Sequence, residues 1–212
     1  MVSAGPPYEE ARERILEAML ELVTTRRYEN TEIAQILDLA GVSRADFDDL
    51  FASKEACAMA VFDRFLADYI ATVQAAYDGE AQWPDSLRSA AYAVADWMVA
   101  NPREVRFGTV EMLWAGDLAQ ARREEGFQTF VRMVDAGRAR AAHPAAAPKY
   151  TAEGVIGSIA VMLTKELQHS GELNPHKFIP EMMYLAVLPF MGEAAAAREL
   201  SMPRPSDTGS QR

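Results

Sequence analysis

Side chains that commonly take part in catalysis are few in this sequence of 212 residues. The three histidines are His143, His169 and His176, and no Ser-His-Asp or Cys-His arrangement can be argued around them. Glu166 and His169 have the E-x-x-H spacing of carboxylate-bridged di-iron bundles, but such a site needs a second copy and two further carboxylates. Neither of the other histidines has that spacing, and glycine-rich phosphate loops are absent. The sequence therefore predicts neither an enzyme nor a bound cofactor or metal.

Charged side chains that could contact nucleic acid lie in residues 31–55, TEIAQILDLAGVSRADFDDLFASKE. Arg44 and Lys54 carry cations of the kind that bind phosphate, while Asp48 and Asp49 carry carboxylates that can accept a hydrogen bond from cytosine. The overall charge argues against this function. The chain has a formal charge of −10, and its first 55 residues hold twelve acidic against six basic side chains. Nucleic-acid binding would then depend on a few cations gathered on one face.

Local sequence signals predict the helices that would position these residues. Apolar side chains at intervals of three or four predict a first helix over residues 8–25, and Asn30 or Thr31 can cap the helix that follows. Gly41 ends this second helix, because the residue just past a helix end often takes the left-handed conformation. The apolar stripe of the second helix is Ile33, Ile36, Leu37 and Ala40.

A capping box predicts the third helix. Ser43 and Asp46 have the S-x-x-D spacing in which each side chain bonds the backbone of the other. Ser53 can cap a fourth helix, with Glu55 in its first turn where the helix dipole favours a negative charge. Two helices joined by a short turn with glycine form a helix-turn-helix. The inward face of its second helix is predicted to be Phe47, Leu50 and Phe51.

The rest of the chain has helical periodicity, and no segment alternates apolar and polar residues long enough to suggest a strand. We expect an all-α protein of about nine helices, with a three-helix head at 1–52, a helical body at 53–200 and a disordered tail at 201–212. Pro189 should kink the last helix. The helices expected after the third span residues 54–78, 84–101, 102–114, 117–142, 151–170 and 175–198.

The sequence also indicates where the protein acts. A lone cysteine, Cys57, excludes an internal disulfide framework and suits a reducing cytoplasm. Residues 1–14 have no apolar core segment, so we expect no signal peptide. The longest apolar runs, such as residues 184–191, are too short to span a bilayer. A cytoplasmic location without membrane contact is the expectation.

Apolar and aromatic side chains of the fifth to eighth helices could line an adaptable effector cavity. Glu111, Glu166 and His169 are polar groups on otherwise apolar segments and could orient a ligand. Taken singly, each apolar residue is equally explained as ordinary core, and each polar one as exposed or hydrogen-bonded. The apolar candidates are Trp97, Phe107, Met112, Trp114, Phe127, Phe130 and Met162.

The last two helices carry Val, Ile, Leu and Met on more than one face. That is more apolar surface than a monomer of this size is expected to expose, so it predicts a partner subunit. The residues we expect at this interface are Ile156, Ile159, Leu163, Met182, Leu185 and Phe190.

Residues 31–55 resemble the TetR/AcrR family of transcriptional regulators. The resemblance is carried by the AGVS turn at 40–43, by Phe47 and Phe51, and by SKE at 53–55, and it extends over about 45 positions. Outside this region the similarity is architectural, apart from residues 183–192 (MYLAVLPFMG), which are similar to the last helix of many actinobacterial-type members.

The resemblance implies a homodimer joined by a four-helix bundle of the last two helices, with the helix at 44–50 in the DNA major groove. It places Ser43, Arg44 and Ala45 near bases and phosphates, and Lys54 at a phosphate. Arg26 and Arg27 are either phosphate contacts or a solvated helix end. The candidate DNA-binding residues are therefore Arg26, Arg27, Thr31, Ser43, Arg44, Ala45, Asp48, Asp49 and Lys54.

Two positions depart from the family pattern. Asp48 stands where an aromatic residue, usually tyrosine, is common, and Asp49 where a basic or polar residue is common. We expect a repressor that is released from double-stranded DNA when a small hydrophobic ligand changes the separation of its two recognition helices. The alternative is a similar helical small-molecule-binding or scaffold protein whose DNA binding is weak or lost.

Overall fold

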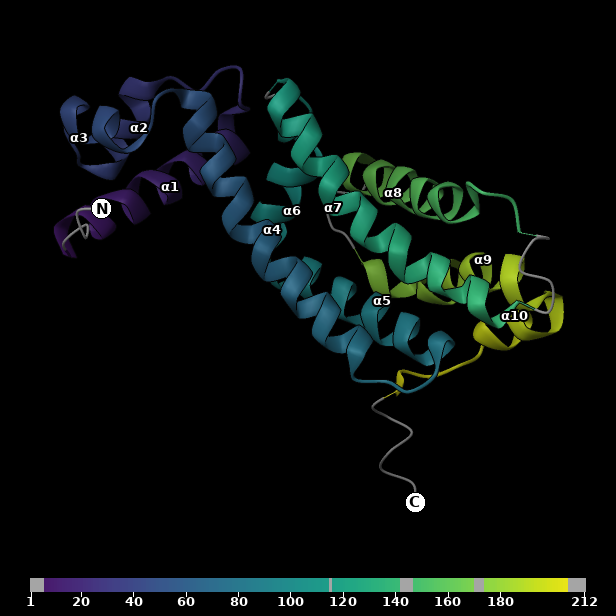
Figure 1. The fold of residues 1–212 in the computed structure, drawn as a ribbon. Helices are drawn as coiled ribbons and strands as arrows, with labels where there is room; N and C mark the ends of the chain where they lie inside the picture. The colour runs from purple at the N-terminus through teal and green to yellow at the C-terminus, as the bar shows by residue number, and fades with distance from the viewer. Residues whose placement is uncertain (1–5, 115, 142–146, 170–173, 206–212) are drawn as a thin grey trace. The chain divides into compact units, whose positions relative to one another are not determined.

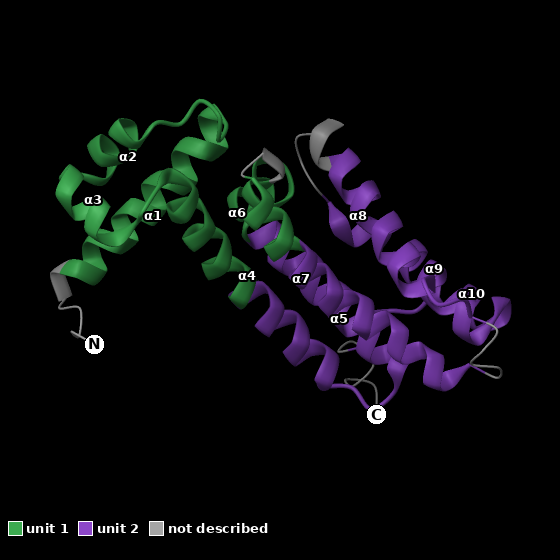
Figure 2. Cartoon of the chain, turned by 45° about the horizontal axis from the view of Figure 1, so that its top comes forward, with its two compact units in different colours: residues 1–67, 101–123 green, residues 68–100, 124–212 purple. Residues whose placement is uncertain are grey.

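The computed structural model describes residues 6–114, 116–141, 147–169 and 174–205, without the side chains of residues 6, 7, 113, 114 and 167–169. Within these residues the chain is all-α, as the sequence predicts, with ten α-helices, several 3-10 segments and no strand (Figure 1). The helices form two compact units, residues 1–67 with 101–123 and residues 68–100 with 124–212 (Figure 2). Two long helices, α4 (Lys54–Asp78) and α7 (Asp117–Asp135), contribute to both units.

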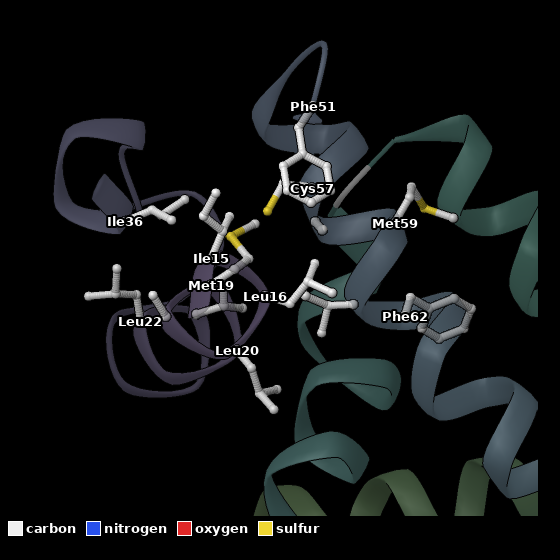
Figure 3. Close-up of a cluster of buried hydrophobic side chains, with 14 of the residues drawn as sticks. Ile15, Leu16, Met19, Leu20, Leu22, Ile36, Phe51, Cys57, Met59 and Phe62 are labelled. Carbon is white, nitrogen blue, oxygen red and sulfur yellow. The ribbon is translucent and has the colours of Figure 1, made fainter. Parts of the chain in front are cut away.

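The first unit surrounds the apolar face of its first helix. Figure 3 shows Ile15, Leu16 and Met19 directed among side chains of the following helices, and all three are fully buried. Burying one such side chain stabilises a fold by about 1.5–3 kcal/mol, so this cluster holds the unit together. The elements of the unit are α1 (Pro6–Arg26), α2 (Ile33–Ala40), α3 (Arg44–Leu50), the first part of α4, α6 (Pro102–Thr109), the 3-10 helix η1 (Glu111–Trp114) and the start of α7.

The second unit is arranged around α9 (Ile179–Met191), which contacts α5, α8 and α10. Trp83 fixes part of this core, because its indole N–H donates to the carbonyl of Met133 at 2.8 Å and its ring meets Phe190 edge-on at 5.6 Å. The other elements of the unit are α5 (Trp83–Ala100), η2 (Ala136–Arg140), α8 (Thr151–His169), η4 (Pro175–Phe178) and α10 (Glu193–Glu199).

A buried ion pair joins α5 to α10 in the second unit. The Arg88 guanidinium donates from Nε and Nη2 to the two oxygens of Glu199, at 2.9 and 3.0 Å. Its Nη1 donates to Asp85 at 2.7 Å. Both Arg88 and Glu199 are almost completely buried, so the short helix α10 is attached to the unit by charge as well as by apolar packing.

Several helix ends differ from the sequence prediction. The helix expected to reach residue 114 ends at Thr109 and is followed by η1, and the one expected to reach residue 142 ends at Asp135 and is followed by η2. The single last helix expected over residues 175–198 was wrong, since the structure has η4, α9 and α10 there. The break falls at Gly192, whose φ of 79° is outside the helical region, while Pro189 lies within α9.

The cap of the second helix also differs. The sequence pointed to Asn30 or Thr31, but the N-cap is Glu32, whose side chain accepts from the backbone of Gln35 while the Gln35 side chain accepts the Glu32 N–H at 3.0 Å. Thr31 lies one residue before this cap, and its buried hydroxyl donates to the carbonyl of Arg27 at 2.9 Å.

The division of the chain into a DNA-binding head at 1–52 and a sensing body at 53–200 stays a prediction. The two compact units are defined by packing alone, and the first unit extends beyond residue 52 to include part of α4, with α6 and η1. The expected tail is described only as far as residue 205. Among those described, no helix combines the length and the apolar composition needed to cross a bilayer.

Candidate nucleic-acid interface

The helix-turn-helix predicted from sequence is present in the first unit. Gly41 has a φ of 64°, and its N–H donates to the carbonyl of Leu37, which ends α2 as expected. The capping box of α3 is also confirmed, since Asp46 N donates to Ser43 Oγ at 3.2 Å and Ser43 N donates to Asp46 Oδ2 at 3.0 Å. Phe47 is fully buried and anchors the helix. These contacts fix which side of α3 faces solvent.

The exposed side of α3 carries Arg44, Ala45, Asp48 and Asp49. Arg44 Nε lies 2.9 Å from both carboxylate oxygens of Asp48, so one of the two acidic residues that depart from the family pattern is paired within the helix. An exposed pair at this spacing contributes about 0.3–0.5 kcal/mol, so Arg44 can leave Asp48 at little cost when a stronger anion is present. Asp49 has no ion pair among the described residues.

The Asp46 carboxylate serves the helix cap. Hydrogen bonds from the Ser43 hydroxyl and then from its backbone N–H hold the pKa of Asp46 below its ordinary value. The residue is therefore ionised at neutral pH, where a negative charge in the first turn stabilises α3.

Lys54 is engaged within the chain. Its Nζ donates to the carbonyls of Tyr28 and Thr31, at 3.0 and 2.9 Å, and lies 4.3 Å from the centre of the Tyr28 ring. A phosphate contact by Lys54 would have to compete with these bonds. Arg26 and Arg27 are exposed near the end of α1, and the guanidinium of Arg27 lies 3.8 Å from Glu29.

Four of the predicted effector residues lie in the first unit. Phe107 and Met112 are completely buried in its core, where Phe107 meets Phe65 edge-on at 6.0 Å. Glu111 is also buried, and its Oε2 accepts the backbone N–H of Tyr28 at 3.1 Å. The side chain of Trp114 lies outside the described residues. The structure thus places Glu111 against the turn that precedes the helix-turn-helix.

The other predicted effector residues lie in the second unit. The rings of Trp97 and Phe130 both pack against Tyr69 in tilted arrangements, with their centres 4.9 and 5.5 Å from its ring centre, and the Trp97 indole donates to Asp68 at 2.9 Å. Desolvation raises the pKa of Tyr69 above its ordinary value. Phe127, Met162 and Glu166 are partly buried, and Glu166 accepts from Lys177 at 3.2 Å.

Sequence reasoning missed Arg123, in α7. It is the only partly buried arginine among the described residues for which no hydrogen bond or ion pair is found, and burial lowers its pKa. Its neighbour Arg122 is paired with Asp63 at 2.8 Å. The sequence offers no means of telling these two arginines apart, because the difference depends on tertiary contacts.

No protein-family model matches the sequence, and no curated protein is significantly similar to it. Several solved structures are similar in fold. A regulatory protein of the TetR family from Rhodococcus RHA1 has a TM-score of 0.65 at 19% identity, covering 85% of this chain and 96% of the other. The transcriptional regulator FadR from Bacillus subtilis, solved with stearoyl-CoA, has a TM-score of 0.67 at 13% identity, covering 84% and 98%. AibR, solved with isovaleryl coenzyme A and operator DNA, has a TM-score of 0.63 at 16% identity, covering 85% and 100%.

The chain has the TetR-family fold.

The predicted dimerisation residues divide into two groups within this fold. Met182 and Phe190 are buried in the core of the second unit, whereas Leu185 is exposed and the α8 members of the set are partly buried. Val161, which the sequence prediction omitted, is the most exposed large apolar side chain among those described in α8. Of these residues Val161 and Leu185 are exposed, whereas Ile156 and Ile159 pack against the buried core of the second unit.

Proposed function

We propose that this protein is a dimeric transcriptional repressor that binds operator DNA through α3 and releases it when a small amphipathic molecule binds. The observation that carries the proposal is the solvent-exposed face of α3, held in place by the buried Phe47 and by the capping box of Ser43 and Asp46. A short helix fixed in this way can enter the major groove without rearrangement, which is how helix-turn-helix proteins read base edges.

The dimer of the proposal would present two copies of α3 to successive major grooves, about 34–36 Å apart. Val161 in α8 is 56% exposed, and Leu185 in α9 is 44% exposed. The two helices contact each other, and exposed apolar side chains on both support an apolar protein surface as the partner. A second copy of the chain supplies such a surface.

Val161→Glu tests this interface. A glutamate there should convert the dimer to a monomer in sedimentation analysis while leaving helix content unchanged. Val99→Glu is the matched control, because Val99 is 54% exposed on α5 and lies outside the proposed surface. If both variants remain dimeric, the interface lies elsewhere.

The effector of the proposal is an acyl-CoA or a related anion with an apolar tail. FadR and AibR were each solved with an acyl-CoA. In the first unit, Arg123 is a partly buried cation with no hydrogen bond or ion pair among the described residues, and a phosphate or carboxylate group would satisfy it. A ligand that binds more tightly at one separation of the recognition helices than at another shifts the protein toward the separation it prefers. In typical allosteric proteins such coupling changes the free energy of binding at the second site, here the operator site, by about 1–3 kcal/mol.

A second function is favoured by one observation. The exposed residues of α3 include three carboxylates, those of Asp46, Asp48 and Asp49, against one guanidinium, and that guanidinium is paired with Asp48. A protein of this kind could retain the effector-binding body while binding DNA weakly. This would be a helical small-molecule-binding or scaffold protein.

Binding to the intergenic DNA upstream of its own gene separates the two functions. The purified protein should bind one inverted repeat saturably, with an affinity that falls linearly with the logarithm of salt concentration, in excess competitor DNA. Palmitoyl-CoA should lower that affinity, whereas coenzyme A alone should not. Equal affinity for operator and competitor at low salt would support the second function.

A further inference from the structure

Two ionic side chains from distant parts of the first unit hold the turn between α1 and α2. The carboxylate of Glu111, in η1, accepts the backbone N–H of Tyr28 at 3.1 Å. The ammonium of Lys54, at the start of α4, donates to the carbonyls of Tyr28 and Thr31 at 3.0 and 2.9 Å. Both backbone groups of Tyr28 are thus bonded to charged side chains more than twenty residues away.

The turn needs such support because its backbone is disfavoured. Arg27 has a φ of 74°, and among the described residues it is the only one other than glycine with a positive φ. A side chain with a Cβ is disfavoured in this conformation, which persists only when surrounding interactions fix it. The Thr31 hydroxyl adds a bond to the carbonyl of Arg27 at 2.9 Å. Two residues later α2 begins, so the geometry of this turn sets the direction of the helix-turn-helix.

Glu111 makes an incomplete set of bonds. The residue is 2% exposed, yet its Oε1 has no hydrogen-bond partner among the described residues, and Nη2 of Arg106 lies 3.9 Å from it. A buried carboxylate is costly unless it is fully hydrogen-bonded. Among the described residues only the Tyr28 N–H donates to this carboxylate, so a displacement of η1 would break the one hydrogen bond through which Glu111 holds the turn.

We propose that Glu111 is a positioning residue for operator binding, which together with Lys54 clamps the α1–α2 turn and so orients α3. The inference rests on the proposed function and names its regulation. When η1 is displaced, the carboxylate leaves the Tyr28 N–H, the turn relaxes and operator affinity falls. Lys54 then acts through the turn and not through a phosphate.

Hydrogen exchange of the Tyr28 amide in the full-length protein measures the clamp directly. Glu111→Ala should speed this exchange about tenfold or more, because one charge-assisted hydrogen bond is lost. Glu111→Gln keeps an acceptor and should change it less than about threefold. The control is Glu124→Gln, an equal charge change at an exposed residue of α7. Unchanged Tyr28 exchange in folded Glu111→Ala would overturn the proposal.

Operator binding by the same variants tests the positioning role. Glu111→Ala should weaken operator affinity about tenfold, and Glu124→Gln less than about twofold. Lys54→Gln should weaken affinity without changing its dependence on salt, whereas loss of a phosphate contact lowers the slope of log affinity against log salt by about one per contact. The effects of Lys54→Gln and Glu111→Ala should be less than additive, because both release the same turn.

The results distinguish the clamp from the function on which it rests. A faster Tyr28 exchange with unchanged operator affinity would overturn the positioning role, as would a reduced salt slope in Lys54→Gln. If the wild-type protein binds no operator, the proposed function fails, and the positioning role fails with it. In that case the exchange comparison still decides whether Glu111 holds the turn.

Discussion

Replacing either partner of the buried Arg88–Glu199 pair should destabilise the second unit, and the two replacements should differ in size. Arg88 and Glu199 are 3% and 6% exposed, and two hydrogen bonds of 2.9 and 3.0 Å join them. Arg88→Met leaves the Glu199 carboxylate buried without its donor. Glu199→Ala leaves a guanidinium that still bonds Asp85 at 2.7 Å, and Asp85 is in contact with solvent.

These contacts set the magnitudes. Removing one partner of a buried pair and leaving an uncompensated charge costs about 3–5 kcal/mol, which applies to Arg88→Met. Losing hydrogen bonds to a charged group that keeps another partner costs about 1.5–3 kcal/mol, which applies to Glu199→Ala. The double variant Arg88→Met/Glu199→Leu should recover much of the loss, because it leaves no buried charge.

Urea unfolding followed by circular dichroism and by tryptophan fluorescence measures these differences, since Trp83 and Trp97 both lie in the second unit. Arg64→Met is the control, because it removes an ion pair to Glu13 of 2.7 Å that is largely in solvent and should cost less than about 1 kcal/mol. Equal losses from Arg88→Met and Glu199→Ala, or a double variant worse than both, would refute the reasoning.

Three further predictions concern single residues. Burial raises the pKa of Cys57 to about 12, so its thiol should react with a disulfide reagent at pH 8 only after unfolding. Gly137→Ala places a Cβ 2.4 Å from the Trp83 ring and should cost about 1–3 kcal/mol, whereas Gly154→Ala meets nothing within 4 Å and should stabilise the isolated subunit by about 0.5–1 kcal/mol; urea midpoints compare the two. The pKa of Asp46 is lowered in the folded protein, so its contribution to stability is present above the unfolded value of about 3.9 and is lost as the pH falls through the folded one. The difference in urea midpoint between wild type and Asp46→Ala should therefore be largest near pH 7 and vanish in acid, and a constant difference would contradict this.

Local chemistry explains what could be predicted from the sequence. Gly41, Ser43 and Asp46 each form hydrogen bonds with residues no more than four positions away, and the turn and capping box that they predict are present. The same holds for Ser53, whose hydroxyl accepts the N–H of Ala56 at 3.0 Å at the start of α4. Such signals are legible because each bond joins residues that are close in the sequence.

Long-range contacts explain what was missed. Thr31 has the right chemistry for a helix cap, but α2 begins at Ile33, so Glu32 occupies the N-cap position, and the Thr31 hydroxyl bonds the Arg27 carbonyl instead. The role of Glu111 depends on a bond to a residue 83 positions earlier, and nothing in the local sequence indicates it. Phe190 was predicted at a subunit interface on its apolar character alone, yet it packs on Trp83 inside the second unit. Apolar character does not say which of two apolar surfaces a side chain meets.

The break at Gly192 had a local signal. A glycine twelve residues after Pro180 and directly after an apolar run is a typical helix end, and its φ of 79° fits that interpretation. Pro189 was the more conspicuous residue, but a proline removes only one backbone donor and can remain within a helix, as it does in α9.

The central claim is that α3 reads operator DNA, and one titration tests it most directly. Ala45 is exposed on α3 and Ala67 is exposed on α4, so Ala45→Glu and Ala67→Glu make the same change in charge and size at two solvent-facing sites. Each variant and the wild type would be titrated against the upstream intergenic DNA by fluorescence anisotropy. If α3 reads the operator, Ala45→Glu should lose specific binding, while Ala67→Glu should stay within about twofold of wild type. Wild-type affinity in Ala45→Glu would contradict it.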